Sequence, residues 1–305
     1  MDQRPVADSD DAFGWADHFS TERRRSPLVT ARATQRGSRV LERAAVLDGR
    51  GTGTDEARML IQVLGHVEVR SAQGRVIHLR PREKAVLGVL LLNAGTSCSA
   101  DMLLQDVWGD DQPADPGSTL RLVVSRIRQA VAPGHLIMRA ASGAYRADPP
   151  PGTLDKHRFE GFLADASRAA KQEDAELETS LLERAMATWP HPEVGFPDVP
   201  DDSMRVRETT ERLLEQRRTA EIRLGDLYLE LGRHEAALPA LRAGYATDPG
   251  SERRCAQLML ALIRSGRRQE ALDAFHQCSK VLAEEYGTHP GDDLQALLIN
   301  ALGGK

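Results

Sequence analysis

The 305-residue sequence contains few aromatic side chains and few cysteines. Phe, Trp and Tyr together make up 4% of the chain, and the three cysteines, Cys98, Cys255 and Cys278, form no CxxC pair and have no neighbouring histidine cluster. The spacing therefore predicts neither a zinc site nor a disulfide framework, and we expect reduced thiols. No nucleophile with a base, carboxylate pair or H-E-x-x-H spacing is visible, so we expect no catalytic site, no metal and no cofactor.

Long apolar runs are also missing. No segment approaches the roughly 18 to 20 apolar residues of a membrane span, and the N-terminus lacks the apolar core of a signal peptide. We therefore expect a cytoplasmic protein without a membrane partner. A Gly-x-x-x-x-Gly-Lys-Ser/Thr phosphate loop is absent too, which argues against direct regulation by ATP.

Charge is distributed unevenly along this acidic chain, whose net charge is −5. Residues 58–150 carry eleven basic and eight acidic side chains, whereas residues 151–305 carry twenty and twenty-seven. This asymmetry favours a DNA-binding module joined to a part that phosphate would repel. Residues 1–57 contain few large apolar side chains, so we expect a mostly disordered N-terminal extension.

Acidic side chains are absent from residues 117–146, which include five arginines. Such a basic island is typical of a nucleic-acid contact. Its first half also has the apolar spacing of one helix face, at Leu120, Val123, Val124, Ile127 and Val131. With that face packed inward, the opposite side of a helix over residues 118–131 is cationic and hydrogen-bonding, as a helix in the DNA major groove requires.

The outward-facing residues divide by their expected contacts. Three of them, spaced four residues apart, are candidates for base edges: Arg121, Ser125 and Gln129. Leu122 is a candidate for a thymine methyl group. The helix start contributes Ser118 and Thr119, and phosphate contacts are expected from Arg126, Arg128, Arg139, Ser142 and Arg146.

The elements around this helix occur in the order of a winged helix-turn-helix. Alternating residues over 61–69 and 75–79 predict a small antiparallel sheet. A helix is expected from Pro81 to the Asn93–Gly95 stop, and a second over 100–108 with Ser99 as its N-cap. After the basic helix, residues 135–146 predict a hairpin around Ser142 and Gly143.

A run of prolines at residues 149–151 marks a domain boundary, beyond which the pattern is helical. The segment 231–238, LGRHEAAL, recurs as SGRRQEAL at 265–272, with its glycine displaced by 34 positions. That displacement is the tetratricopeptide period, so residues 151–305 are expected to form paired helices. The predicted fold is mainly α with a small β part: a winged helix over 58–150, then an all-α domain.

Several motifs occur in a fixed order along the chain: LGHVEV at 64–69, PREKAVL at 81–87, LLLNAG at 90–95, VWGD at 107–110, STL at 118–120, VSRIR at 124–128, GAY at 143–145, RCAQLMLAL at 254–262 and VLAEEYGTHPG at 281–291. Together they resemble the Streptomyces antibiotic regulatory proteins in their small form, and the resemblance covers about residues 59–302. Proteins of this family have an OmpR-type winged helix followed by a bacterial transcriptional activation domain.

The resemblance implies an activator that binds direct repeats near the promoter −35 region and helps RNA polymerase holoenzyme to engage. The loop with Asp110, Asp111, Gln112 and Asp115 matches the position of the transactivation loop, although a plain turn is an equal interpretation. Two molecules bound head to tail would suit direct repeats. Two alternatives stay open: an interaction adaptor that uses the helical repeats, and a repressor that uses the same DNA contacts.

Overall fold

The computed structural model of the chain describes residues 59–131, 136–139, 143–189, 194–200 and 203–303. The N-terminal extension predicted over residues 1–57 lies outside these residues. The described chain packs as two compact units that divide between Leu231 and Gly232. This division follows the contacts within the folded chain, whereas the boundary expected between residues 150 and 151 was inferred from the prolines in the sequence. The two describe different properties, so the domain limits given above stay a prediction.

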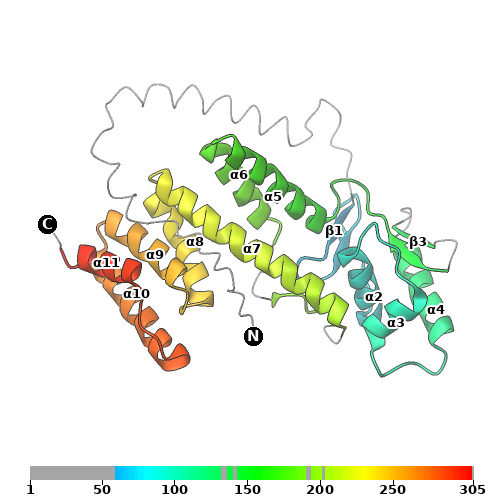
Figure 1. Ribbon diagram of the computed structural model, residues 1–305. Coiled ribbons are helices and arrows are strands. Elements are labelled where there is room, and N and C mark those ends of the chain that lie inside the picture. Colours follow the sequence, from blue (N-terminus) through cyan, green and yellow to red (C-terminus); the bar gives the residue numbers. More distant parts are fainter. Residues whose placement is uncertain (1–58, 132–135, 140–142, 190–193, 201–202, 304–305) are drawn as a thin grey trace, which may run out of the picture. The chain divides into compact units, whose positions relative to one another are not determined.

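The first unit begins as a winged helix and continues into three further helices (Figure 1). Its elements are β1 (Leu60–Gln62), β2 (Glu68–Arg70), α2 (Pro81–Leu92), α3 (Ala100–Trp108), α4 (Pro116–Ala130), β3 (Ile137–Arg139), β4 (Tyr145–Ala147), α5 (Asp155–Lys171), α6 (Ala175–Met186) and α7 (Met204–Glu230). The helices predicted from Pro81 and over 100–108 are confirmed. At the start of α3, the Ser99 side chain accepts a hydrogen bond from the amide of Met102, which explains why the helix begins there.

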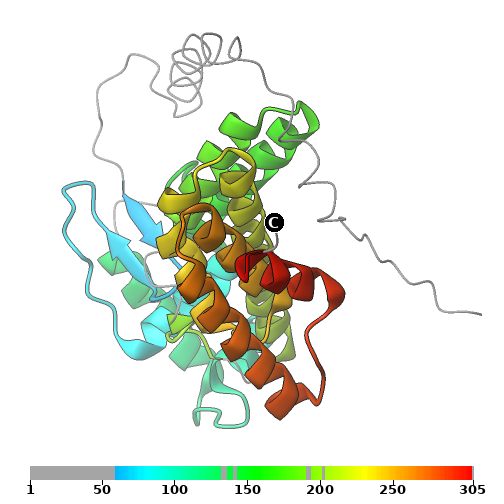
Figure 2. The ribbon, with the colours of Figure 1, turned by 90° about the vertical axis from the view of Figure 1, so that its left-hand side faces the viewer.

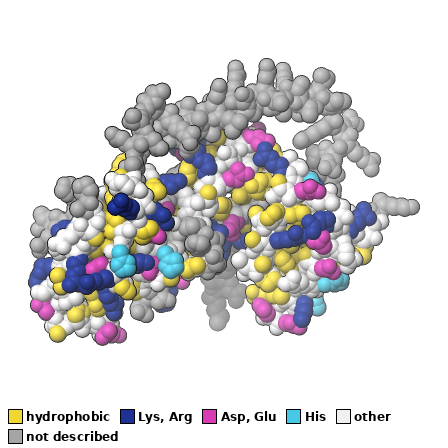
Figure 3. All heavy atoms as spheres, turned by 180° about the vertical axis from the view of Figure 1, so that it is seen from behind, with side chains coloured by type: hydrophobic (Ala, Val, Ile, Leu, Met, Phe, Trp, Pro, Cys, Tyr) yellow, Lys and Arg dark blue, Asp and Glu magenta, His cyan; other side chains and the backbone are white. Residues whose placement is uncertain are grey.

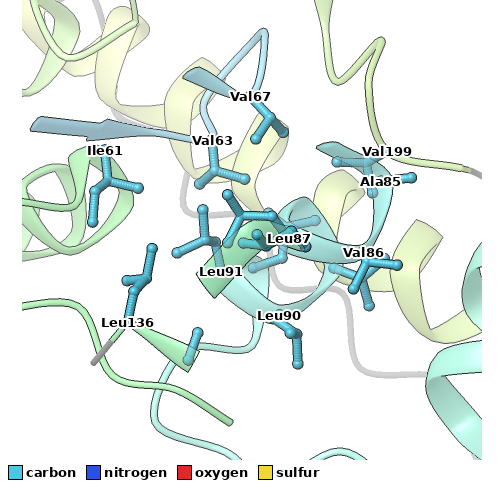
Figure 4. Close-up of a cluster of buried hydrophobic side chains, with 14 of the residues drawn as sticks. Ile61, Val63, Val67, Ala85, Val86, Leu87, Leu90, Leu91, Leu136 and Val199 are labelled. Atoms are coloured by element: carbon cyan, nitrogen blue, oxygen red, sulfur yellow. The ribbon is translucent and has the colours of Figure 1, made fainter. Parts of the chain in front are cut away.

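Helix α2 lies in the core of the winged helix and is buried on nearly all sides. Every residue from Ala85 to Leu92 is buried. Figure 4 shows Val63 above Leu91, and Val199 beside Ala85. A helix enclosed in this way needs apolar residues around its whole circumference, which accounts for the almost continuous apolar run in its sequence.

The strand predicted over residues 61–69 is wrong as a single element, because the chain turns inside it. β1 pairs antiparallel with β2, and the turn between them passes through Gly65, whose φ of 110° favours glycine. The second predicted strand, over 75–79, instead makes an isolated bridge to β2. Val63 and Leu64 in the turn are fully buried, so the apolar pattern continues through it and conceals the break.

A buried carboxylate holds this turn. Asp155, the first residue of α5, accepts hydrogen bonds from the amides of Val63, at 3.0 Å, and Leu64, at 2.9 Å. Burial raises the pKa of Asp155 to about 6, although hydrogen bonds from the amides of Leu64, Val63 and Lys156 act in the opposite direction. The turn amides therefore pair with a side chain instead of with a neighbouring strand.

The hairpin predicted after the basic helix is present as β3 and β4. These strands pair antiparallel, with Ile137 opposite Ala147. At the base of the hairpin, Tyr145 and Cys98 exchange two backbone hydrogen bonds of 2.8 Å each. The wing is thereby fastened to the segment that connects α2 to α3.

Helices α5, α6 and α7 pack through small and aliphatic side chains. The buried members of this cluster are Ala166, Ala169, Leu181, Leu182, Ala220, Leu224 and Leu227. Beside it, Arg223 of α7 donates two hydrogen bonds of 2.8 Å to the carboxylate of Glu178 on α6. This two-pronged pairing fixes the orientation of α7 against α6.

The second unit consists of helices in sequence: α8 (His234–Thr247), α9 (Glu252–Arg264), α10 (Arg268–Val281), the π-helical turn η5 (Leu282–Tyr286) and α11 (Asp292–Ala301). Helices α9 and α10 lie side by side in both ribbon views (Figures 1 and 2). Gly232 and Gly266 have φ values of 71° and 74°, and each precedes a helix that starts two residues later. The two copies of the repeat thus share a left-handed glycine before a helix, and the fold is mainly α with a small β part, as predicted.

Candidate nucleic-acid interface

The basic helix α4 starts two residues earlier than its apolar pattern indicated. Asp115 is its N-cap: the carboxylate accepts a hydrogen bond of 3.0 Å from the amide of Ser118, and Pro116 occupies the first turn. The hydrogen bonds from the Ser118 side chain and amide, together with the charge of Arg121, hold the pKa of Asp115 below its usual value. A proline at the first helical position and a capped amide fix where α4 begins.

The inward face of α4 is the one predicted from spacing. Its apolar side chains are all buried, none more than 7% exposed: Leu120, Val123, Val124, Ile127 and Val131. They pack into the core around α2. The register of α4 is therefore fixed by its apolar face, which determines which side chains face outward.

The outward face of α4 carries all but one of the helix side chains expected to contact DNA. Exposed residues on α4 are Ser118, Arg121, Leu122, Ser125, Arg126, Arg128 and Gln129, whereas Thr119 is half-buried. Leu122 is 51% exposed, which is unusual for a leucine in a helix whose other large apolar residues are buried. Figure 3 shows basic side chains on the part of the surface that the winged helix forms. DNA contact by each of these residues stays a prediction.

One of the candidate base-reading side chains is held in place before any DNA is bound. The guanidinium of Arg121 donates a hydrogen bond of 2.7 Å to Ser118 Oγ, one turn earlier on α4. An orientation fixed in this way lowers the entropy cost of a bidentate contact to guanine. Ser118 therefore orients Arg121 as well as lying on the exposed face itself.

The wing differs from the sequence-based expectation at one arginine. Arg146 donates to Asp148 Oδ2 at 2.8 Å through Nε and lies 2.7 Å from it through Nη2. A phosphate contact would have to compete with this carboxylate. The segment without acidic side chains, residues 117–146, ends at Arg146. Asp148, the partner of Arg146, lies two residues beyond that segment and was therefore not considered with it. Arg139 lies in β3, and Ser142 lies outside the described residues.

The acidic loop between α3 and α4 projects from the helices in both ribbon views (Figures 1 and 2). Gln112 braces it, because its Nε2 donates to the carbonyls of Gly109, at 2.7 Å, and Leu104, at 3.3 Å. Asp115 caps α4, whereas Asp110 and Asp111 are exposed. Of the four residues predicted to contact polymerase, Gln112 and Asp115 therefore also have structural roles.

Sequence reasoning missed the residues that support α3 from a distance. Arg205 and Ser203, from the start of α7, both bond to the buried carboxylate of Asp106. The partners are about a hundred positions apart, and no local pattern links them. A partner closer in sequence, Arg82 of α2, also supports α3 by donating a hydrogen bond of 2.8 Å to the carbonyl of Val107.

Two other properties concern only the described part of the chain. Among those residues, no group of three or more His, Cys, Asp or Glu side chains is arranged to hold a metal ion. Across the same ranges, no helix is both long and apolar enough to span a membrane.

Comparison with known proteins gives consistent matches for both halves of the chain. Residues 74–146 match the family described as transcriptional regulatory protein, C terminal, and residues 154–300 match the bacterial transcriptional activator domain. Regulatory protein DnrI of Streptomyces peucetius is 30% identical over 78% of this chain and 90% of its own length. Regulatory protein AfsR of Streptomyces coelicolor is 34% identical over 71% of this chain, although the match spans 21% of AfsR.

A solved structure has the same architecture. EmbR of Mycobacterium tuberculosis, in complex with a low-affinity phosphopeptide, superposes with a TM-score of 0.68 at 25% identity. The superposition covers 80% of this chain and 65% of the EmbR chain. The winged helix and the helices after it thus occur together in a related protein.

Proposed function

The chain belongs to the Streptomyces antibiotic regulatory proteins, a family of transcriptional regulators, and on that premise we propose that it is a sequence-specific DNA-binding activator. In this proposal α4 enters the major groove of promoter DNA and the wing contacts the backbone beside it. Two molecules occupy direct repeats near the −35 region head to tail, and they recruit RNA polymerase holoenzyme to genes for antibiotic or secondary-metabolite synthesis.

The observation that carries the proposal is the two-sided character of α4. One face of the helix is buried in the core, and the other presents arginines and hydrogen-bonding side chains in a segment without a single acid. Arg121, Ser125 and Gln129 are all exposed on that face at a spacing of about one turn. Arginine pairs bidentately with guanine, and amide side chains pair with adenine, so this row is suited to base edges.

A gel-shift titration against salt tests DNA binding directly, using promoters of the surrounding gene cluster. Four arginines are expected at phosphates: Arg126, Arg128, Arg139 and Arg146. If each neutralises one phosphate, the plot of log affinity against log salt concentration has a slope of about −3.6. Arg121→Ala should lower affinity for the preferred site by about 1 to 3 kcal/mol, which corresponds to roughly 5- to 150-fold, while nonspecific binding changes less. Arg168→Ala, which removes an exposed arginine from α5, is the matched control.

Transcription from the same promoters with RNA polymerase separates activation from repression. An activator raises RNA synthesis from a promoter that polymerase uses poorly, whereas a repressor lowers it. Specific binding with lowered RNA synthesis would replace the activator proposal by the repressor. Absence of any specific shift, with Arg121→Ala equal to wild type, would instead favour an adaptor built on the helical repeats.

The exposed acids of the loop are the proposed polymerase contact. We expect Asp110→Asn with Asp111→Asn to leave the gel shift unchanged and to reduce RNA synthesis, because neither residue caps a helix or braces the loop. Asp101→Asn, at an exposed acid on α3, is the control. Equal RNA synthesis in both variants would mean that the loop is a plain turn.

Nuclease footprinting tests the arrangement on DNA. Two protected sites in the same orientation, occupied together, would support the head-to-tail pair. A single inverted repeat would contradict it, because a two-fold palindrome is read by an isologous dimer.

A further inference from the structure

A single carboxylate joins the winged helix to the segment that leads into α7. Asp198 accepts hydrogen bonds from the amide of Val67, at 2.8 Å, and from Lys84 Nζ, at 3.1 Å. His66 Nδ1 lies 3.1 Å from the same oxygen. The β1–β2 turn and α2 therefore both meet the segment 194–200 at Asp198, which is more than a hundred residues from either of them in sequence.

Apolar packing brings the same segment tightly against α2. A Cβ atom placed on Gly88 would lie 2.7 Å from Val199 Cγ2 and 3.0 Å from Val67 Cγ2. Carbon atoms in contact are normally about 3.5 to 4.0 Å apart, so any larger residue at position 88 would push the segment away. The close approach depends on glycine at this position.

A second contact reaches from α7 to α3. The guanidinium of Arg205 pairs with the carboxylate of Asp106, and Ser203 Oγ donates to the other oxygen at 2.5 Å. The Asp106 side chain is 6% exposed and that of Arg205 is 30% exposed, so the pair is largely shielded from water. Arg205 Nη2 also lies 3.4 Å from Cys98 Sγ, before the start of α3. Arg205 thus contacts α3 near its end and the segment just before its beginning.

The position of α3 determines where the acidic loop departs. Asp106 precedes the end of α3 by two residues, and the loop with Asp110 and Asp111 follows directly. Gln112 bonds back to the carbonyl of Leu104, so the loop is braced on the same helix. A displacement of α3 would therefore move the loop. None of the bonds that Arg205 makes to Asp106 and Cys98 involves the exposed face of α4.

We propose that the winged helix and α5–α7 move as one body, and that Arg205 is a positioning residue that holds α3 and its acidic loop where activation requires them. This inference rests on the proposed activator function. DNA binding uses the exposed face of α4, so loss of Arg205 separates two activities: promoter binding remains and activation falls.

The first test compares Arg205→Ala with Arg207→Ala, which removes an exposed arginine two positions further along α7. Both activities are measured on one promoter, well below the melting temperature of each variant. We expect Arg205→Ala to keep DNA affinity within about twofold, since the sites are separate. We expect activation to fall about tenfold, the upper part of the range for coupling residues. Arg205→Lys should restore part of it, because lysine keeps the charge but loses the planar fork.

A second pair of variants acts on the same junction without removing a charge. Gly88→Ala should drive Val199 away from α2 and reproduce the loss of activation with DNA affinity retained. Adding Val199→Ala removes the nearer of the two crowded atoms, Val199 Cγ2, and should recover much of the activation. A structural defect unrelated to the junction would show no such recovery.

Hydrogen exchange on the unaltered full chain needs no variant and decides the question if a variant does not fold. One body requires the protected amides of α2, α3 and α7 to open together. Opening of α2 and α3 independently of α7 would overturn the proposal. Full activation by both Arg205→Ala and Gly88→Ala would also overturn it, as would an equal loss of DNA affinity and activation in these two variants. Promoter binding by wild type without any rise in RNA synthesis would count against the activator function instead.

Discussion

The two compact units are held together in different ways. The unit that ends at Leu231 depends on carboxylates that bond across long stretches of sequence, such as Asp155 with Val63 and Asp106 with Arg205. The unit that starts at Gly232 depends on consecutive helices that pack through small residues, with Tyr245 donating to the carbonyl of Ala274 at 2.9 Å. Long-range bonds to buried carboxylates resist local opening, but the first unit loses much of its stability when one partner of such a bond is removed. The second unit spreads its stability over many similar contacts between neighbouring helices.

The largest effect expected on stability comes from Arg205→Ala, which leaves the buried carboxylate of Asp106 without its charged partner. We expect the free energy of unfolding of the first unit to fall by about 3 kcal/mol. The buried cysteines report on each unit separately, Cys98 on the first, and Cys255 and Cys278 on the second. Alkylation of Cys98 should accelerate in the variant while the other two keep their wild-type rates.

Arg207→Ala is the control for this measurement, and its Cys98 should react as slowly as in wild type. Burial raises the pKa of the Cys255 and Cys278 thiols, so both should react slowly until α9 and α10 separate. Equal acceleration at all three cysteines would show that the two units open together, and the contrast between them would be lost.

Asp155→Asn should have the next largest effect. The amide group that replaces the carboxylate turns a donor toward the amides of Val63 and Leu64, and a buried donor left without a partner costs about 2 kcal/mol. The variant also changes the pH dependence. The folded pKa of about 6 exceeds the unfolded value of about 3.9, so this group contributes stability below pH 4 that is lost as pH rises through 6.

Urea unfolding of wild type and Asp155→Asn between pH 4 and pH 7 measures both effects. The wild type should lose stability relative to the variant as pH rises across this interval, and the variant should lack that slope. Glu215→Gln, at a carboxylate with 70% of its side chain exposed, is the control and should follow wild type. Parallel curves for wild type and Asp155→Asn would show that Asp155 does not titrate there.

The sequence was sufficient where structure depends on near neighbours. Ser99 capping α3, the inward row of α4 and the glycine turns of the repeat all follow from residues within a few positions of one another. The turn at Gly65 was missed because the buried residues around it continue the apolar alternation. The contact of Asp106 with Arg205 was invisible, because pairing across about a hundred residues depends on tertiary packing that no local pattern encodes.

The candidate interface shows the same limit on a smaller scale. Helix periodicity correctly predicted which face of α4 is exposed, since one face is fixed by burial. It could not predict that Arg121 bonds to Ser118, nor that Arg146 is paired with Asp148. Each of these arginines has several possible hydrogen-bond partners within reach, and the folded structure determines which partner it bonds.

The smallest effect expected, and the sharpest control, concerns two exposed glycines. A Cβ atom at Gly266 meets nothing within 4 Å, but φ is 74°, so Gly266→Ala should cost about 1 kcal/mol from backbone strain alone. Gly161, inside α5, is equally uncrowded but helical, so Gly161→Ala should stabilise its unit by about 0.5 to 1 kcal/mol. Thermal unfolding of both variants would decide between backbone strain and crowding. Stabilisation by both substitutions would mean that the turn at Gly266 does not need a left-handed residue, and that the repeated units are held by helix packing without help from their turns.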